Sequence, residues 1–490
     1  MDNLKVGISA LTTYVPPYRV DLERWCEWTD NSWDKINNIV GSGFRVLGPN
    51  QTIYSMAANA VLDLIVSHEV NPSEIGFLAL GTESSTDNSA GSIIIKGMVN
   101  EELKNRKMET ISSRCEVPEF KQACLSGIYA LKNAVRFIKS DAPSLKAIIV
   151  CSDIALYQIG ASGEPTQGAG AIAVLVEKDP KIAEVRTELS GTSSDYRLLD
   201  FRKPIQYRAK QASDHSDFDI DLPIFNGKYS SSCYLDETIS AMDDMTKRRT
   251  LHTAEYLRNI SAAFLHRPFH KMPMTAFSIV YLHALAHGNK NDKAELEAYA
   301  LASDIDFEEL LNELINRPNV SEFANNDVNA DFLPLSNRVI KKVNNDDKFH
   351  NNVLAKIKYG SLLTMEMGNI YSGSVFGWLA AGMEDAINKG IDWSNQEALL
   401  FGYGSGDAAE VIPLIFTNEW KEASIKSNFS NAFKDRYNLS QEQYLTLRSE
   451  KTTNGIDHQL RNQFVVKRIG TEERDDFQDA GIEYYEYLNQ

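Results

Sequence analysis

The chain has 490 residues, of which 43 % are hydrophobic and 24 % are charged, and its formal net charge is −17. This balance is typical of a folded globular protein and excludes predominant disorder. The negative charge argues against extended nucleic-acid binding, which needs clustered positive charge, although a local basic patch would still hold a small anion. The length allows about three domains, or two large ones on a shared core.

The five cysteines are an odd number and form no CxxC pair and no metal-ligand spacing: Cys26, Cys115, Cys124, Cys151 and Cys233. We therefore expect free thiols in a reducing, cytoplasmic compartment. The N-terminal stretch has the pattern of a first strand that runs into two prolines, not that of a signal peptide. No uninterrupted apolar run is long enough to span a membrane.

The first 180 residues alternate between strand and helix patterns. Residues 75–80 (IGFLAL) and 147–150 (AIIV) are short apolar runs, typical of strands buried on both faces. Between them, residues 125–139 place their apolar side chains on one face of a helix, and residues 168–176 (GAGAIAVLV) predict another buried strand. This order predicts a layered α/β fold.

The second half repeats the pattern more loosely. An amphipathic helix is expected at 253–264, a strand at 276–281 (AFSIVY) and a helix at 374–388 that stops before Gly390. Strands are expected at 398–401, which opens into the glycine turn GYGSG at 402–406, and at 411–416. The layout fits a duplicated α/β unit with halves at 1–180 and 181–420, although no internal repeat is visible residue by residue.

Two stretches differ from this pattern. Residues 288–347 are rich in Asn, Asp and Glu. They predict an inserted, mostly helical subdomain or lid, because so long a loop without structure is unusual. Residues 421–490 predict a polar C-terminal extension with one strand candidate at 464–469. No low-complexity linker separates the parts, so the two halves are expected to share one core.

Cys124 stands in EFKQACLSG, between an extended segment and the start of the helix at 125–139. Unpaired N–H groups and the positive end of the helix dipole would favour a thiolate there, which suits a nucleophile that forms a thioester. The alternative is a small buried hydrophobic residue. The local sequence leaves both interpretations open.

His266 and Glu83 are the other candidates for chemistry. His266 follows the helix at 253–264 and has Arg267 and Lys271 close by in the sequence, so it either meets a substrate or is structural. Glu83 ends the strand IGFLAL at the sheet edge where α/β folds place reactive groups. It is either a general base, with a pKa raised by its surroundings, or a helix cap. Other histidines lack such a context and are expected to be structural: His283, His287 and His350.

The glycine runs at 163–171 (GEPTQGAGA) and 402–406 (GYGSG) match neither a GxGxxG fingerprint nor a phosphate-binding P-loop. Glycines beside strands either make tight turns or bring backbone N–H groups close to a thioester oxygen, as in an oxyanion hole. The glycines alone favour the turns.

Taken in order, a set of segments spanning roughly residues 1–416 resembles the 3-hydroxy-3-methylglutaryl-CoA (HMG-CoA) synthase family of the thiolase superfamily. The segments are GTESSTDNS, EFKQACLSG, SDIALYQIGASGEPTQGAGAIAVL, LPIFNGKYSSSCY, FLHRPFHKM, MGNIYSGSV and GYGSG. The most specific are GEPTQGAGA and MGNIYSGS. The resemblance implies a thiolase-like fold with duplicated β-α-β-α-β halves in αβαβα layers, and a homodimer.

The resemblance also implies a two-step condensation on the mevalonate route to isoprenoids. Cys124 would be acetylated by acetyl-CoA, and Glu83 would remove a proton from the acetyl methyl. The carbanion would then attack the ketone of acetoacetyl-CoA, which His266 would polarise, and water would free the enzyme. Further residues are implied in substrate binding, with Lys271 as the candidate for a CoA phosphate: Tyr157, Thr166, Lys271, Asn369 and Ser405. No metal or organic cofactor is expected.

The chain departs from the family pattern at several points. Asn226 stands where an Asp is common, and Met274 and Thr275 replace basic residues, which weakens the case for CoA binding at that spot. The acidic insertion at 288–347 is atypical and falls near the presumed entrance of the site. The segment between Glu83 and Cys124 is also longer than in the bacterial pattern.

Several alternatives share part of this evidence. The nearest is the same chemistry on an acyl-carrier protein, as in polyketide β-branching, which uses the same Cys, His and Glu. A charge of −17 opposes an acidic carrier unless a basic patch faces it. A fatty-acid ketoacyl synthase would lack Glu83. A non-catalytic scaffold with a thiolase fold and a Cys/His hydrolase are more remote. The candidate basic patch is Lys247, Arg248 and Arg249.

Overall fold

A computed structural model describes residues 4–87, 90–207, 221–427 and 429–489. Its centre is a ten-stranded sheet in the order β10-β11-β12-β8-β1-β7-β6-β4-β5, with β9 paired to β12. The strands are β1 (Val6–Tyr14), β4 (Ile75–Gly81), β5 (Glu119–Phe120), β6 (Lys146–Ala155), β7 (Gly168–Lys178), β8 (Ala183–Val185), β9 (Gly191–Ser194), β10 (Ala263–Leu265), β11 (Glu397–Gly404) and β12 (Ala408–Phe416).

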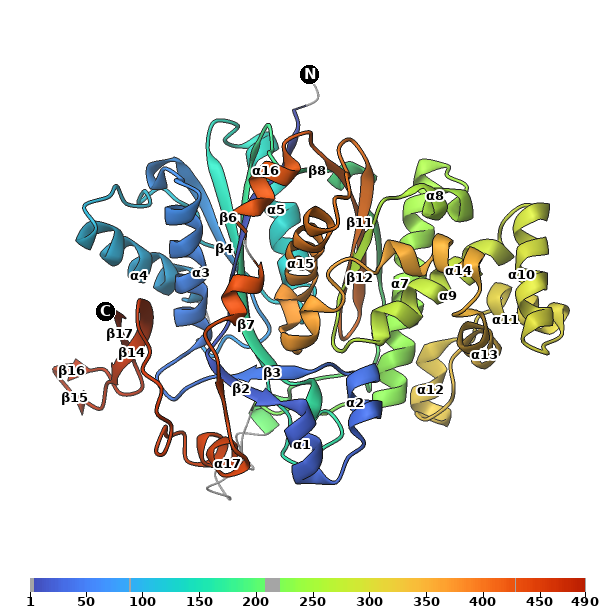
Figure 1. The fold of residues 1–490 in the computed structure, drawn as a ribbon. Coiled ribbons are helices and arrows are strands. Elements are labelled where there is room, and N and C mark those ends of the chain that lie inside the picture. The colour runs from blue at the N-terminus through green and yellow to red at the C-terminus, as the bar shows by residue number, and fades with distance from the viewer. Residues whose placement is uncertain (1–3, 88–89, 208–220, 428, 490) are drawn as a thin grey trace.

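Helices cover this sheet in layers. Figure 1 shows α5 and α15 between the arm formed by β4, β6 and β7 and the arm formed by β11 and β12. Helices α3 and α4 lie outside the first arm, and α7 and α9 lie outside the second. This is the αβαβα layering expected from the sequence. The helices are α3 (Ile53–Ser67), α4 (Gly91–Asn105), α5 (Ser126–Ser140), α7 (Gly227–Arg249), α9 (Met272–Ala286) and α15 (Ser374–Asn388).

Alternation along the strands explains why both faces need helices. In β6, Ile149 packs in the core that contains α5, whereas the neighbouring Ile148 and Val150 pack in the core that contains α3. Successive side chains of a strand point to opposite faces, so an all-apolar strand requires cover on each side. Strand β6 pairs in parallel with β4 and antiparallel with β7.

Two elements of the second half differ from expectation. Residues 276–281, expected as a strand, lie inside α9, which is buried around nearly its whole circumference. A continuous apolar run fits a fully buried helix as well as a buried strand. The helix expected at 253–264 ends earlier, as α8 (Thr253–Asn259), and its last residues form β10.

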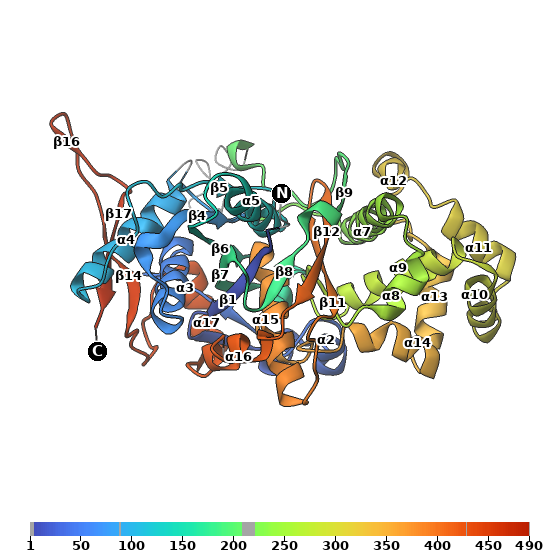
Figure 2. The same ribbon diagram turned by 90° about the horizontal axis from the view of Figure 1, so that it is seen from above.

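The insertion at 288–347 is helical, as expected. It contains α10 (Lys290–Ala302), α11 (Phe307–Ile315), α12 (Val320–Asn326) and α13 (Pro334–Val343), and α14 (Asp347–Asn352) follows. Arg258 ties α10 to α8, because its Nη2 lies 2.7 Å from Asp292 Oδ1 and 3.1 Å from Glu295 Oε2. Seen from above, these helices form one end of the molecule, and the hairpin of β14 (Gln463–Ile469) and β17 (Glu483–Leu488) lies at the other (Figure 2).

The N- and C-terminal parts meet in a small sheet, β13-β2-β3. Its core joins Leu22 and Trp25 to Leu439, Tyr444 and Leu447. None of the described helices is both long and apolar enough to cross a membrane. The remaining elements are β2 (Tyr18–Asp21), α1 (Leu22–Thr29), α2 (Trp33–Ile39), β3 (Gly43–Val46), α16 (Trp420–Ile425), β13 (Tyr437–Asn438), α17 (Gln441–Ser449), β14 (Gln463–Ile469), β15 (Glu473–Arg474), β16 (Phe477–Gln478) and β17 (Glu483–Leu488).

Candidate active site

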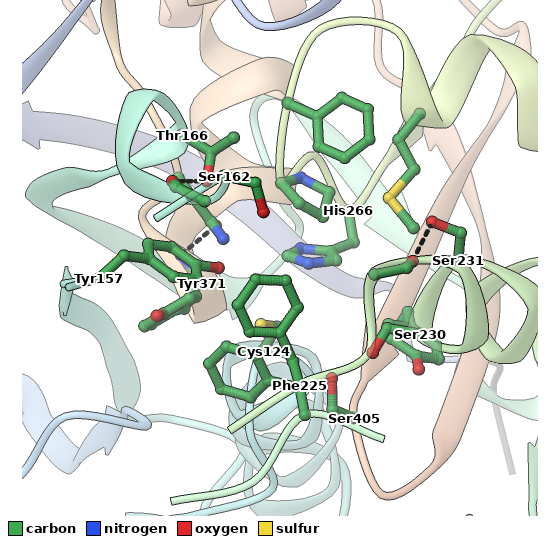
Figure 3. A pocket seen from close by; sticks show the side chains of 18 residues that line it. Cys124, Tyr157, Ser162, Thr166, Phe225, Ser230, Ser231, His266, Tyr371 and Ser405 are labelled. Atoms are coloured by element: carbon green, nitrogen blue, oxygen red, sulfur yellow. Dashed lines mark hydrogen bonds between the residues drawn. The ribbon is translucent and has the colours of Figure 1, made fainter. Parts of the chain in front are cut away.

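A cavity of about 170 Å³ lies where the two halves meet. Cys124, Tyr157 and His266 come from distant segments and border the same space (Figure 3). The lining residues are Cys124, Tyr157, Ser162, Gly163, Thr166, Phe201, Phe225, Gly227, Ser230, Ser231, His266, Pro268, Phe269, Met272, Asn369, Tyr371, Tyr403 and Ser405. Six residues singled out from the sequence are among them, and Glu83 and Lys271 are not.

Cys124 directly precedes α5, and its Sγ lies 3.4 Å from Glu83 Oε2. Burial, followed by the charge of Glu83, raises the pKa of the thiol well above its usual range. This corrects the expectation that the helix end favours a thiolate. Desolvation outweighs the effect of the helix end here. In addition, the N–H groups of Leu125 and Ser126 at the start of the helix already donate to Gln122 O and Ala123 O. At rest Cys124 is a thiol whose near acceptor is Glu83.

Glu83 follows β4, at the sheet edge expected from the sequence. Burial raises the pKa of its carboxyl to about 7, and the Lys203 ammonium opposes this rise. Lys203 Nζ lies 3.9 Å from Glu83 Oε1 and 3.2 Å from Asp221 Oδ1. A carboxyl with a pKa near neutrality exists in both protonation states, which suits a group that takes and returns a proton.

Asp153 in β6 holds the Glu83 loop in place and was not singled out from the sequence. Its Oδ1 accepts from the backbone N–H groups of Glu83 at 2.7 Å and Ser84 at 3.0 Å. Its Oδ2 accepts from the backbone N–H of Ser372 at 3.0 Å and from the Ser372 hydroxyl. One buried carboxylate thus joins the loop after β4 to the short 3₁₀ helix at Tyr371–Gly373. Its only sequence signal is an acidic residue inside an apolar strand.

His266 follows β10 and is 2 % exposed. Its backbone N–H donates to Phe401 O at 2.7 Å, and its Nδ1 lies 2.7 Å from Ser374 Oγ. Burial lowers the pKa of the imidazole to about 3, so the ring is neutral at physiological pH. With Nδ1 paired to Ser374, Nε2 is the nitrogen left for a ligand. The Tyr403 ring stacks on the imidazole at 6.3 Å.

Asn369 and an aromatic wall complete the cavity. Asn369 Oδ1 accepts from Tyr371 N at 2.9 Å, which leaves the amide NH₂ for a ligand, and its backbone N–H donates to Thr166 O at 3.1 Å. Phe225 packs edge-on to Tyr157 at 5.4 Å. Burial raises the pKa of both wall tyrosines, Tyr157 and Tyr371, so they remain neutral phenols.

The GYGSG turn joins β11 to β12 and carries Ser405 into the cavity. A side chain at Gly404 would place its Cβ 2.4 Å from Gln122 O, so this glycine lets the turn lie against the loop that holds Cys124. The turn is therefore tight and lies close to the loop that holds the candidate nucleophile. A role of its N–H groups in an oxyanion hole stays a prediction.

Other expected features lie outside the cavity. Lys271 is exposed, next to the lining residue Met272. No lining residue comes from 288–347, so this subdomain lies outside the cavity wall. In the candidate basic patch, Arg248 pairs with Asp244 and Arg249 with Glu397.

The chain is similar to known families and proteins over most of its length. The model for the hydroxymethylglutaryl-coenzyme A synthase N terminal matches residues 3–181, and the model for the C terminal matches residues 209–466. Hydroxymethylglutaryl-CoA synthase A of Dictyostelium discoideum is 26 % identical over 411 residues, 82 % of this chain and 74 % of that protein. Hydroxymethylglutaryl-CoA synthase of Enterococcus faecalis is 23 % identical over 461 residues, 94 % of this chain and 96 % of that protein.

Solved structures give the same result for the fold. MvaS in complex with 3-hydroxy-3-methylglutaryl coenzyme A superposes with a TM-score of 0.74 at 23 % identity, over 99 % of this chain and 100 % of that one. The curacin pathway HMG synthase in complex with holo donor-ACP superposes with a TM-score of 0.69 at 20 % identity, over the same shares. The fold is the thiolase-like fold, and the chain belongs to the hydroxymethylglutaryl-CoA synthase family.

Proposed function

We propose that this chain condenses acetyl-CoA with acetoacetyl-CoA to give 3-hydroxy-3-methylglutaryl-CoA, through an acetyl group carried on Cys124. The observation that carries the proposal is the 3.4 Å contact between Cys124 Sγ and Glu83 Oε2, beside a cavity that also presents His266 and Asn369. A nucleophile, an acid–base group and two donors for a carbonyl oxygen are the parts such a condensation needs.

In the first step Cys124 Sγ attacks the thioester carbonyl of acetyl-CoA. The thiol proton passes by way of Glu83 to the departing CoA sulfur, so that one C–S bond forms as another breaks. The acetyl group remains a thioester, which keeps its methyl group activated.

In the second step ionised Glu83 takes a proton from the acetyl methyl, and the resulting enolate attacks the ketone carbon of the acceptor. Neutral His266, through Nε2, and the Asn369 amide donate to the ketone oxygen as it becomes an alkoxide. Protonated Glu83 returns its proton to that oxygen. Water then cleaves the Cys124 thioester and restores the free thiol. We propose a cytoplasmic homodimer that needs no metal or organic cofactor.

An acetoacetyl group on a carrier protein is the second candidate acceptor. What supports it is that the described residues lining the cavity include no Lys or Arg to bind the phosphates of CoA. Such a lining suits the uncharged part of the pantetheine arm, which CoA and acyl-carrier proteins share. Turnover with the CoA acceptor would place the chain on the mevalonate route, and turnover with the carrier acceptor alone would place it in β-branching.

The test measures thiol release from acetyl-CoA with acetoacetyl-CoA and acetoacetyl-carrier protein as parallel acceptors, and it follows the acetyl adduct by mass spectrometry. Cys124→Ser should form no thioester adduct, whereas the control Cys115→Ser, whose side chain does not line the cavity, should keep it. Glu83→Ala should still be acetylated, although more slowly than wild type, because loss of the carboxylate removes the proton carrier of the first step but also lowers the pKa of the thiol. It should not condense. An adduct that survives in Cys124→Ser, or product formed by Glu83→Ala, would overturn these roles.

A further inference from the structure

Two buried carboxyl groups meet beneath the GYGSG turn. Asp407 begins the return from the turn and is 4 % exposed, and Asp200 follows β9 and is 2 % exposed. The Tyr403 hydroxyl lies 2.8 Å from Asp200 Oδ2 and 3.0 Å from Asp407 Oδ1, and the Gly406 N–H donates to Asp407 Oδ1 at 2.6 Å. Neither carboxyl lines the cavity. However, both are hydrogen-bonded to Tyr403, which lines it, and Asp200 directly precedes the lining residue Phe201.

One oxygen of each carboxyl lacks a hydrogen-bond donor. Asp200 Oδ1 and Asp407 Oδ2 are buried and have no hydrogen-bond partner. A carboxylate oxygen of each lies within 4.8 Å of the other and of Cys233 Sγ. Two ionised carboxyls this close together, each with a buried oxygen that no donor reaches, are destabilised. A single proton on either carboxyl would supply the missing donor.

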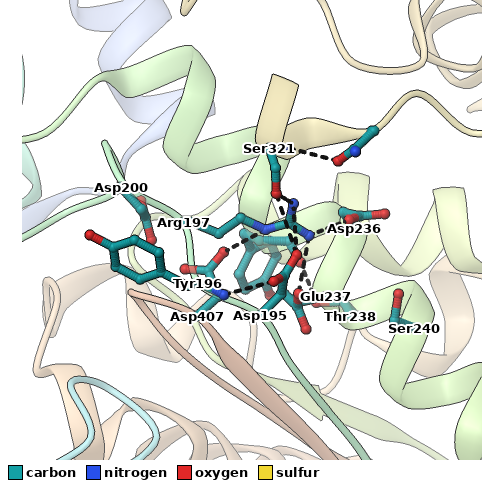
Figure 4. A network of polar contacts seen from close by, with 12 residues as sticks. Asp195, Tyr196, Arg197, Asp200, Asp236, Glu237, Thr238, Ser240, Ser321 and Asp407 are labelled. Atoms are coloured by element: carbon teal, nitrogen blue, oxygen red, sulfur yellow. Dashed lines mark hydrogen bonds and ion pairs between the residues drawn. The ribbon is translucent and has the colours of Figure 1, made fainter. Parts of the chain in front are cut away.

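The surroundings do not supply enough positive charge. Arg197 Nε lies 3.7 Å from Asp407 Oδ2, but Arg197 also serves Asp195, Asp236 and Glu237 (Figure 4). Arg317 pairs with Asp236 at 3.0 Å. Two guanidinium groups thus face five carboxyls, and the other titratable groups turned toward the pair are the neutral phenols of Tyr229 and Tyr403 and the Cys233 thiol.

We propose that Asp200 and Asp407 share one proton, and that this carboxyl pair positions the Tyr403–Gly406 turn against the cavity. Tyr403 joins the pair to the site, because its hydroxyl bonds the carboxyls while its ring stacks on His266. Ser405 follows in the same turn and lines the cavity. Asp200 and Asp407 are positioning residues, since they act through the turn.

The charge on the carboxyl pair determines how the activity should change with pH. Burial and the hydrogen bond with Asp200 raise the pKa of Asp407 to about 9. The proton is therefore held at neutral pH and lost in alkaline solution, where two adjacent negative charges repel and the turn shifts. Condensation should fall with this loss. Asp407→Asn carries an amide that donates to Asp200 and does not ionise, so the variant should lack this alkaline fall relative to its own neutral rate.

Stability offers a test that does not depend on the proposed function. The folded pKa of Asp407 lies above its ordinary value of 3.8, so the folded chain holds a proton that the unfolded chain releases. Wild type should lose about tenfold in its folding equilibrium constant for each pH unit across this window, relative to Asp407→Asn. The Tm of Asp407→Asn minus the Tm of wild type should therefore increase as the pH rises from 6 to 9. Asp195→Asn, whose side chain is 55 % exposed, is the matched control and should keep a constant offset.

Each outcome is decisive for one part of the proposal. A Tm difference for Asp407→Asn that stays flat with pH would overturn the shared proton. So would one equivalent of metal in the purified protein that Asp407→Asn lacks, because a cation would then neutralise the pair. The activity comparison rests on the proposed function. If the Tm difference increases with pH but wild type and Asp407→Asn lose activity identically in alkaline solution, the pair does not position the turn. Inactivity of both proteins would contradict the proposed function and leave the stability test intact.

Discussion

At the scale of single residues, Glu83 is held between a cation and an anion. The Lys203 ammonium lowers the pKa of Glu83 and the Asp153 carboxylate raises it. Burial also raises this pKa, and its effect is larger than that of either neighbour. Lys203 is itself buried, with 8 % of its side chain exposed, so solvent screens this pair weakly. The protonation state of the proposed base is therefore set by neighbours that do not line the cavity.

The pH dependence of condensation should follow from this arrangement. The base must be ionised, so kcat/KM should fall about tenfold per unit below a pKa near 7. In Lys203→Met the lowering charge is gone, and the acidic limb should move to higher pH. Lys203→Arg keeps the charge and should hold the limb close to its original place. A pH profile from 5.5 to 9 for the three proteins checks this, and a limb that stays fixed in Lys203→Met would show that another group is the base.

Sequence reasoning found Cys124, His266 and Glu83 from local signals, and the other site residues only through the family resemblance. Cys124 precedes a helix, and Glu83 ends an apolar strand. Asp153 shows only as an acidic residue in an apolar strand, and Lys203 has no local signal. The importance of both depends on contacts made across the sheet and between loops. The thiolate expectation failed for a related reason, since burial cannot be read from a helix boundary.

At the scale of elements, α9 shows how an apolar run can be misassigned. Twelve of its fifteen residues are buried, so it lacks the polar face that marks most surface helices. Helices α7, α8, α10, α11 and α13 pack against it. By contrast, the strands β4, β6, β7, β11 and β12 were predicted correctly, because short apolar runs, some of them beside glycines, mark them in the sequence. The insertion thus covers α9 and not the cavity, a relation that no local pattern reveals.

Shortening a buried side chain of α9 should therefore lower the stability of the fold and leave the cavity intact. Leu282 is 0 % exposed, and Leu282→Ala should lower the free energy of unfolding by about 2–5 kcal/mol through lost burial and a cavity. Leu301→Ala on α10 is the control, because Leu301 is 79 % exposed and its loss should change stability by less than about 0.5 kcal/mol. Urea denaturation measures both. Equal stability of the two variants would contradict the buried position of α9.

At the scale of the whole molecule, the C-terminal extension supports the cavity from behind. The Tyr444 hydroxyl donates to Glu164 Oε1 at 2.8 Å and accepts from Gln167 Nε2 at 2.9 Å. Arg448 Nη2 donates to Tyr157 O at 3.1 Å. Helix α17 thus holds the GEPTQG segment and the Tyr157 wall, although it is separated from them by nearly 300 residues. Its polar sequence gave no sign of this role.

Removing one hydroxyl should reveal this support. Tyr444→Phe keeps the buried ring but leaves Glu164 and Gln167 without their shared partner, which should lower stability by about 1–3 kcal/mol. Because Thr166 lies between those residues and lines the cavity, the variant should also raise KM by about threefold to tenfold while acetylation of Cys124 persists. Tyr484→Phe removes a similar hydroxyl-to-carboxylate bond, to Asp479 at 2.8 Å, in the distant C-terminal hairpin. That control should leave KM unchanged, and an equal rise in both variants would mean that α17 does not act on the cavity.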